Sequence, residues 1–413
     1  MKFEYLKRLG PGLVTGAADD DPAGIATYSQ VGAQFGYSLG WTMLFSFPLM
    51  AVIQAVSARI GSVTGYGIAQ NLRRHYSPQL LRGMVMLLLI ANVINLGADL
   101  GAMGAALRLL IGGPQLFYTA LFAAICVLLE IFTSYARYAA VLKWTTLSLF
   151  AYVAVVFAAH VPWAKALHDT FIPQFVFNKE HTTAMVALLG TTISPYLFFW
   201  QAGQEVEEQR RRHIKPLYVA PRKAEKELAR IRIDTLTGMG ISNLIALFII
   251  FATAATLHAH GVTHIQTSEQ AAEALRPVAG VFAFALFAAG IIGTGMLAVP
   301  VLAGSAAYAV SEVFQWAEGL DRKPREAKAF YATIAVATLA GVAMNFTALD
   351  PIKALYWSAV VNGVLAAPLM AVMMVIAMNK RIMGKFTLRR PMFLIGWLAT
   401  IVMVLATIAF FVI

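Results

Sequence analysis

Near its N-terminus the chain reads Asp19-Asp20-Asp21-Pro22-Ala23-Gly24, inside an apolar segment that otherwise has the length of a membrane span. A carboxylate at the centre of a bilayer costs roughly 2.5 to 3.5 kcal/mol on insertion scales, so such a group faces a cavity, a partner or a cation. Pro22 and Gly24 break the helix at this depth, and a break frees backbone carbonyls that can also bind a ligand. The stretch therefore predicts a functional site within the membrane.

The composition is that of a polytopic membrane protein. Of the 413 residues, 59% are hydrophobic and 13% are charged, and the mean hydropathy of +0.69 lies outside the range of ordinary soluble domains. The single cysteine, Cys126, excludes a disulfide framework. The basic start, Met1 to Arg8, runs into Gly10-Pro11-Gly12 rather than into the apolar core of a signal peptide, so no cleaved signal is expected.

Eleven apolar segments are long enough, at about 20 residues each, to cross a bilayer as helices. We expect them near residues 10–35, 38–60, 82–107, 115–133, 138–160, 182–205, 237–258, 279–302, 327–345, 354–378 and 391–412. The chain is thus predicted to be all-α, and the odd number of spans places its two termini on opposite sides of the membrane.

The distribution of Lys and Arg predicts the orientation. With a cytoplasmic N-terminus, 27 of the 32 basic residues fall on the inner side and 5 on the outer side. The run from Arg210 to Arg232 is then a cytoplasmic loop that faces anionic lipid, and we do not expect it to bind nucleic acid. A multi-pass protein of a bacterial cell membrane is predicted, with the N-terminus inside and the C-terminus outside.

A second break lies in the sixth span, which contains Thr191-Thr192-Ile193-Ser194-Pro195-Tyr196. Spans one and six are the first members of two successive sets of five. Broken helices at corresponding places indicate a transporter built from inverted repeats, with its site between the breaks. Within a single transmembrane domain, 1–413, we expect a first repeat at 1–160, an inverted repeat at 161–378 and an additional helix at 379–413. The acidic break favours a cation as the substrate.

At these residues the chain resembles the Nramp family of divalent-metal transporters. Residues 21–24 lie where the family has its DPGN motif, and residues 190–201 lie where it reads G-A-T-V-M-P-H and continues to a second histidine. Ala98-Asp99-Leu100 is similar to the family's D-L-x-E stretch, and Gly10-Pro11-Gly12 also matches. The resemblance implies a LeuT-like fold with broken helices one and six.

The departures from the family pattern concern the metal ligands. The family's metal-binding Asn is replaced by Gly24, its metal-binding Met by Ser194, and its two histidines by Tyr196 and Gln201. Thioether sulfur suits manganese and iron, whereas oxygen ligands and retained water suit magnesium. The pattern resembles the Nramp-related magnesium transporters, which implies Mg²⁺ as the substrate, with Mn²⁺ also accepted. The metal is cargo, and no cofactor is expected.

The resemblance also implies a ligand set. Asp21 would supply its side chain, Ala18 and Thr191 their backbone carbonyls, and Ser194 an optional hydroxyl. Around these ligands or in the outer vestibule we place Asp19, Asp20, Gly24, Tyr196, Gln201 and Asn362. Asp19 is as consistent with a helix cap as with a vestibule charge, and hydrogen bonding between helices is the favoured role for Asn362.

Residues of the third span indicate whether metal transport is coupled to protons. Asn92, Asn95 and Asp99 can share one face of this helix, where they would either form structural hydrogen bonds or line the pathway. The family's third-span Glu is replaced by Ala102, and both sixth-span histidines are missing, so a proton relay lacks its titratable groups. We therefore expect transport without proton coupling. The alternative is a proton-coupled Mn²⁺ or Fe²⁺ symporter.

Two further classes of protein are less consistent with the sequence. An organic-cation or amino-acid transporter could use the same fold, although three acids at the break disfavour an anionic substrate. An intramembrane enzyme would need a nucleophile–base pair or an H-E-x-x-H helix, and the sequence has neither.

Glu205, Glu207 and Glu208 are expected to form a solvated segment paired with the adjacent arginines rather than a metal site. The predicted partners are a divalent cation and the lipid bilayer, with no obligate protein partner.

Overall fold

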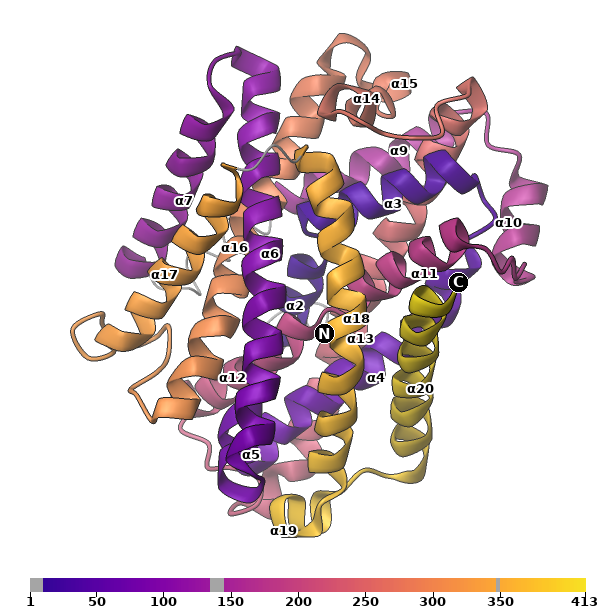
Figure 1. The fold of residues 1–413 in the computed structure, drawn as a ribbon. Coiled ribbons are helices and arrows are strands. Elements are labelled where there is room, and N and C mark those ends of the chain that lie inside the picture. The colour runs from indigo at the N-terminus through magenta and orange to yellow at the C-terminus, as the bar shows by residue number, and fades with distance from the viewer. Residues whose placement is uncertain (1–9, 134–144, 347–349) are drawn as a thin grey trace, which may run out of the picture.

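The computed structural model describes residues 10–133, 145–346 and 350–413, and every regular element in these ranges is a helix (Figure 1). Among the described residues, eight helical runs are long and apolar enough to cross a membrane, and a ninth is added if α9 and α10, bent by 119° at their junction, count as one span. Together with the broken first span and the 17-residue helix α17, these account for the eleven predicted spans. Residues 138–144 of the predicted fifth span lie outside the described residues.

The first five spans follow the predicted order along the chain. They are α2 (Pro11–Asp19) with α3 (Pro22–Phe35), α4 (Trp41–Thr64), α6 (Pro78–Ile111), α7 (Gln115–Phe132), and η1 (Thr145–Leu149) with α9 (Phe150–Ala158). The next six are α11 (Lys179–Thr192) with α12 (Pro195–Arg211), α13 (Ala224–Thr256), α16 (Ala283–Phe314), α17 (Lys328–Met344), α18 (Pro351–Met378) and α20 (Arg390–Val412).

Short helices connect the spans. They are α5 (Ile68–His75), η2 (Pro221–Lys223), η3 (His258–His260), α14 (Ser268–Glu273), α15 (Arg276–Ala279), η4 (Gly280–Phe282), α19 (Lys380–Met383) and η5 (Gly384–Phe386). The helix α10 (Trp163–Phe171) follows α9 and forms the bent pair of the fifth span with it.

Several contacts between helices are the same in the two sets of five spans: a contact between two spans recurs between the two spans at the corresponding positions. The broken first span packs on α13, the seventh span, and the α12 half of the sixth span packs on α4, the second span. Similarly, α6 packs on α7 as α16 packs on α17, and α6 packs along α16. In Figure 1 the helices α6, α7, α16 and α17 form one side of the bundle. This recurrence is the pattern that two related repeats produce.

The two breaks have the same backbone design. Asp20 ends α2 with ψ 48°, and the extended residue Asp21 precedes Pro22, the first residue of α3. Ile193 likewise ends α11 with ψ 58°, and Ser194 precedes Pro195. Proline is favoured at the first position of a helix because its missing N–H would have no partner there. Each break therefore exposes the C-terminus of one half-helix beside the N-terminus of the next.

Small residues let α2 approach α13 closely. A Cβ added to Gly12 would lie 2.8 Å from the backbone nitrogen of Thr235, and one added to Gly16 would collide with the backbone of Gly238. Membrane helices associate through such close backbone contacts because lipid offers no hydrophobic driving force. The half-helix that leads to the aspartates is thus fixed against the seventh span.

Gly16→Ala should lower the melting temperature of the purified protein by several degrees, because overpacking a close contact costs about 1 to 3 kcal/mol. Gly83→Ala is the matched control, since a Cβ there meets nothing within 4 Å and alanine favours a helix over glycine. Thermal unfolding in detergent measures both. A Gly16→Ala protein as stable as the wild type would contradict the close contact.

Candidate metal site

The break in the first span is organised around Asp21. This residue is the N-cap of α3, and its Oδ1 accepts a hydrogen bond of 2.7 Å from the backbone N–H of Gly24. Its side chain is buried. An N-cap carboxylate satisfies one of the free N–H groups at the start of a helix and interacts favourably with the helix dipole. One carboxylate oxygen is thereby fixed by its own helix, and the other faces the rest of the bundle.

The second oxygen of Asp21 is approached from two other helices. Its Oδ2 accepts a hydrogen bond of 2.9 Å from Asn95 Nδ2 on α6, and it lies 3.2 Å from the hydroxyl of Tyr196 on α12. The same hydroxyl lies 3.0 Å from the carbonyl oxygen of Ala18 in the last turn of α2. Two of the predicted ligands, the side chain of Asp21 and the carbonyl of Ala18, are therefore brought to one spot.

The third-span residues separate into different environments. Asn95 accepts a contact of 3.4 Å from Asn362 on α18, so both of these amides belong to the surroundings of Asp21. Asn92 instead donates to the carbonyl of Leu302 and to Ser305, at 2.9 and 2.5 Å, on α16. Asn92 therefore has the structural role that was one of its two predicted alternatives.

Asp99 is fully buried on the same helix, four residues after Asn95. Neither of its carboxylate oxygens has a hydrogen-bond partner within the described ranges. It is close enough to Asp21 for the two carboxylates to repel each other. A cation nearby would relieve that repulsion, because opposite charge stabilises both ionised groups.

The three consecutive aspartates do not converge. The hydroxyl of Ser242 on α13 lies 2.8 Å from Asp19 Oδ2 and 3.0 Å from Asp20 Oδ1, and it can donate its one hydrogen to either of them. They therefore face α13, whereas Asp21 faces α6 and α12. In the described part of the chain, no three His, Cys, Asp or Glu residues are grouped so that they could hold a metal ion. A cation beside Asp21 would need carbonyl, amide, hydroxyl or water oxygens to complete its coordination.

At the second break the polar side chains bond within their own span or pack against the first break. The hydroxyl of Ser194 donates within its own span, to the carbonyls of Gly190 and Thr191 at 3.0 and 2.8 Å. The hydroxyl oxygen of Thr191 lies 3.1 Å from where a Cβ on Gly24 would sit. The absence of a side chain at position 24 therefore lets the two breaks meet. Ser194 and Thr191 remain predicted ligands.

Gln201 lies apart from Asp21. Its Oε1 accepts a hydrogen bond from the hydroxyl of Thr15, which ties α12 to α2 one turn before the break. Its Nε2 has no partner among the described residues. Gln201 therefore links the two half-helices.

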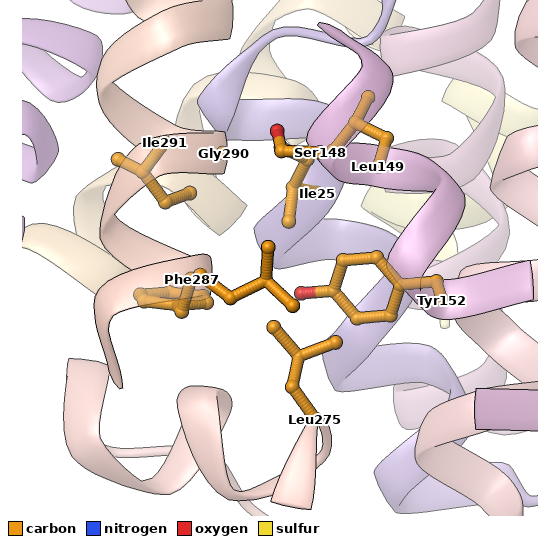
Figure 2. Close-up of a pocket in the computed structure, with 9 residues that line it drawn as sticks. Ile25, Ser148, Leu149, Tyr152, Leu275, Phe287, Gly290 and Ile291 are labelled. Carbon is orange, nitrogen blue, oxygen red and sulfur yellow. The ribbon is translucent and has the colours of Figure 1, made fainter. Parts of the chain in front are cut away.

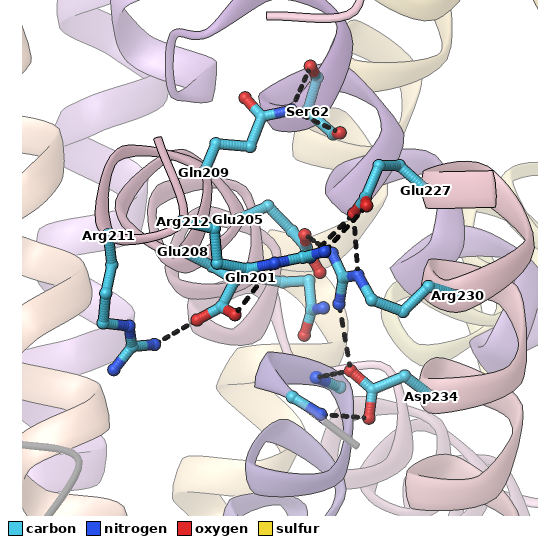
Figure 3. A network of polar contacts seen from close by, with 12 residues as sticks. Ser62, Gln201, Glu205, Glu208, Gln209, Arg211, Arg212, Glu227, Arg230 and Asp234 are labelled. Atoms are coloured by element: carbon cyan, nitrogen blue, oxygen red, sulfur yellow. Dashed lines mark hydrogen bonds and ion pairs between the residues drawn. The ribbon is translucent and has the colours of Figure 1, made fainter. Parts of the chain in front are cut away.

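An ion-pair network joins the ends of α2 and α12 to α13 (Figure 3). Arg230 contacts Glu205 at 2.5 Å, Glu227 at 3.0 Å and Asp234 at 3.8 Å. Arg212 pairs with Glu227 at 2.8 Å.

The expectation of a solvated acidic segment is wrong for Glu205, which is buried because α13 brings Arg230 over it. It is also wrong for Glu207, which is buried and accepts hydrogen bonds from the Tyr308 hydroxyl and the Leu320 N–H. Glu208 pairs with Arg211, as expected.

Asp234 completes this network by capping α2. Its carboxylate accepts from the backbone N–H groups of Gly10, Gly12 and Leu13, at 2.9, 2.8 and 3.1 Å. Sequence reasoning did not single out Asp234 or Arg230. The available signal was their spacing of four residues at the start of an apolar helix, which places both on one face.

A small pocket lies near the first break (Figure 2). It is lined by Ile25, Ser148, Leu149, Tyr152, Leu275, Leu286, Phe287, Gly290 and Ile291. Ile25 is one turn beyond Asp21 on α3, but Asp21 itself does not line the pocket. The lining is mostly apolar, so this pocket does not have the chemistry of a cation site.

Known proteins resemble this chain in sequence and in fold. A transporter of Caldanaerobacter subterraneus described as "Divalent metal cation transporter MntH" is 26% identical over 93% of this chain and 87% of its own length. The protein of the same description from Verminephrobacter eiseniae is 28% identical, over 70% of this chain and 64% of that relative. The crystal structure of the Eremococcus coleocola manganese transporter superposes with a TM-score of 0.76 at 17% identity, covering 98% of this chain and 86% of that one.

The structural likeness confirms the predicted all-α, LeuT-like fold. The proteins that resemble the chain in sequence are described as transporters rather than enzymes, as expected. Residues 12–413 match the family model described as natural resistance-associated macrophage protein-like. Nearly the whole chain is matched, and it therefore belongs to the Nramp family.

Proposed function

We propose that this protein transports divalent metal cations across the membrane by alternating access, with the cation held at Asp21 between the two broken helices. One observation carries the proposal. The Asp21 carboxylate, the Ala18 carbonyl, the Asn95 amide and the Tyr196 hydroxyl meet at one buried spot. A buried carboxylate beside a helix break is a site for a cation. Transport of divalent metals by relatives of this family supports it.

The donor set favours Mg²⁺, with Mn²⁺ as a second substrate. The possible ligand atoms gathered at Asp21 are oxygens, namely its own carboxylate, the Ala18 carbonyl and the Tyr196 hydroxyl, and Ser194 stands where the family has its methionine. Magnesium is bound through one or two carboxylates while it keeps several waters. One carboxylate, together with neutral oxygens, suits that mode of binding.

The chain lacks the residues to which the resemblance to the family assigns proton coupling. The acids Asp19, Asp20 and Asp99 lie near enough to Asp21 to repel it. However, the family's third-span Glu is Ala102, and its histidine positions are Tyr196 and Gln201, which bond to Ala18 and Thr15. We propose uniport, in which two charges crossing 100 mV gain about 4.6 kcal/mol. The proton-coupled symporter is the alternative.

The topology is part of the proposal. The recurrence of helix contacts supports repeats at residues 1–160 and 161–378 and an extra helix at 379–413. The excess of Lys and Arg on one side supports a cytoplasmic N-terminus and an extracytoplasmic C-terminus in a bacterial cell membrane. The network of Arg230 would then lie on the cytoplasmic side.

Asp21→Asn should abolish Mg²⁺ and Mn²⁺ uptake into proteoliposomes while the protein still folds, because asparagine keeps the N-cap but removes the charge. Asp350→Asn is the matched control, since Asp350 caps α18 in the same way, accepting from Ile352 N–H. That variant should transport normally. Uptake by Asp21→Asn at the wild-type rate would refute the assignment of the site.

Uniport predicts that Mg²⁺ uptake leaves the internal pH unchanged. Proteoliposomes that contain a pH-sensitive dye and carry an inside-negative potassium diffusion potential provide the measurement. Uptake should rise with the potential, and the dye signal should stay flat. Acidification of the lumen in fixed proportion to Mg²⁺ would establish the symporter instead.

Ser194→Met should shift the preference from Mg²⁺ toward Mn²⁺, because a thioether binds the softer ion better. The substitution also removes the hydrogen bond of 2.8 Å to the Thr191 carbonyl and leaves that oxygen available. Competition between the two ions in an uptake assay measures the ratio. An unchanged ratio would show that position 194 does not face the ion.

A further inference from the structure

The hydroxyl of Tyr196 lies between two oxygens that belong to the proposed cation site. It is 3.0 Å from the Ala18 carbonyl and 3.2 Å from Asp21 Oδ2, and its side chain is 0% exposed. A phenol has a single hydrogen to donate. It can therefore serve only one of these acceptors at a time. A cation at the same place would attract both.

We propose that the Tyr196 hydroxyl competes with the cation for its binding position. A cation then binds only if it gains more free energy at Asp21 and Ala18 than displacing the hydroxyl costs, which divalent cations do and monovalent cations do not. This inference rests on the proposed function, because it takes Asp21 and Ala18 as ligands. Tyr196 thus weakens the binding of every cation by the same factor, which leaves Mg²⁺ bound and Na⁺ or K⁺ largely excluded.

The other partners of Asp21 show why Tyr196 is the one that can be displaced. Oδ1 is bound by the N–H of Gly24 in the same helix, and Oδ2 keeps the amide of Asn95 at 2.9 Å. Both oxygens of Asp21 therefore retain a hydrogen bond when the phenol leaves. The contacts of the hydroxyl with Asp21 Oδ2 and with the Ala18 carbonyl are lost, and a cation would replace both.

The cost of displacing the hydroxyl affects monovalent cations more than divalent ones. Breaking the contacts of the phenol has a fixed cost, which is the same for every cation that takes its place. The attraction of a cation to Asp21 scales with its charge, so at equal distance a divalent ion gains twice as much as a monovalent ion. The fixed cost therefore removes a larger fraction of the gain of Na⁺ or K⁺ than of Mg²⁺.

The arrangement also connects ion binding to helix movement. Tyr196 is in the first turn of α12, whereas Ala18 and Asp21 lie on either side of the break between α2 and α3. The ring is enclosed by the core, so the hydroxyl leaves its place when α12 shifts or turns against the first span. Binding of the cation and movement of α12 away from the first span then favour each other.

The test is Tyr196→Phe in the purified full-length protein, titrated calorimetrically with Mg²⁺ at several Na⁺ concentrations. Loss of the hydroxyl should tighten Mg²⁺ binding on the order of threefold to tenfold, the range that corresponds to a net hydrogen bond. Na⁺ should inhibit Mg²⁺ binding more strongly in the variant than in the wild type. The melting temperature before Mg²⁺ is added should fall, and the rise on adding Mg²⁺ should be larger.

Tyr331→Phe is the matched control, because its hydroxyl donates to the backbone carbonyl of Arg322 at 3.0 Å, away from the site. It should lower the melting temperature without changing the affinity for Mg²⁺ or the effect of Na⁺. Tyr196→Leu, which also lacks the hydroxyl, provides a second test if Tyr196→Phe does not fold.

The outcomes separate this inference from the proposed function. Weaker Mg²⁺ binding by Tyr196→Phe would overturn it by showing that the hydroxyl is itself a ligand. Unchanged Mg²⁺ affinity and unchanged Na⁺ inhibition would overturn it by showing that the hydroxyl is not at the cation position. If Asp21→Asn still binds Mg²⁺, the proposed site itself fails. If Asp21→Asn abolishes binding and Tyr196→Phe behaves as the wild type, only the role of Tyr196 fails.

Discussion

A carboxylate that is buried within a bilayer needs hydrogen-bond donors or a cation. Three helices of this structure supply hydrogen-bond donors to Asp21. The break provides the N–H of Gly24, the third span provides Asn95, and the sixth span provides Tyr196. Each donor comes from a different helix, so the site exists only when these helices are assembled. The close contact between Gly24 and Thr191 serves the same end, because it brings the two breaks together.

Most of the fold could be predicted from the sequence because membrane helices are long apolar runs. The predicted second span at residues 38–60 is α4, Trp41–Thr64, and the eleventh at 391–412 is α20, Arg390–Val412. The spans are uninterrupted in most cases, so their length alone defines them. The two breaks could be predicted as well, because a proline in the interior of a helix removes a backbone hydrogen bond and kinks or ends the helix there.

The site was predicted less completely, because contacts between helices are not encoded by spacing within one helix. Asp21 was identified as the principal acid, but nothing local indicated that Asp19 and Asp20 would turn to Ser242 on the seventh span. The burial of Glu205 was missed because its partner, Arg230, lies 25 residues further along the chain. Such partners are fixed only by tertiary packing.

The half-helix α2 has a consequence for ion release. It is nine residues long and ends at the break, and its glycines hold it against α13. Ala18 belongs to α2 and Asp21 caps α3, so the proposed coordination shell joins two helices across a break in the backbone. A movement of α2 together with α13 relative to α3 would take the Ala18 carbonyl away from Asp21. The affinity for the cation would then fall in the same movement that opens the site.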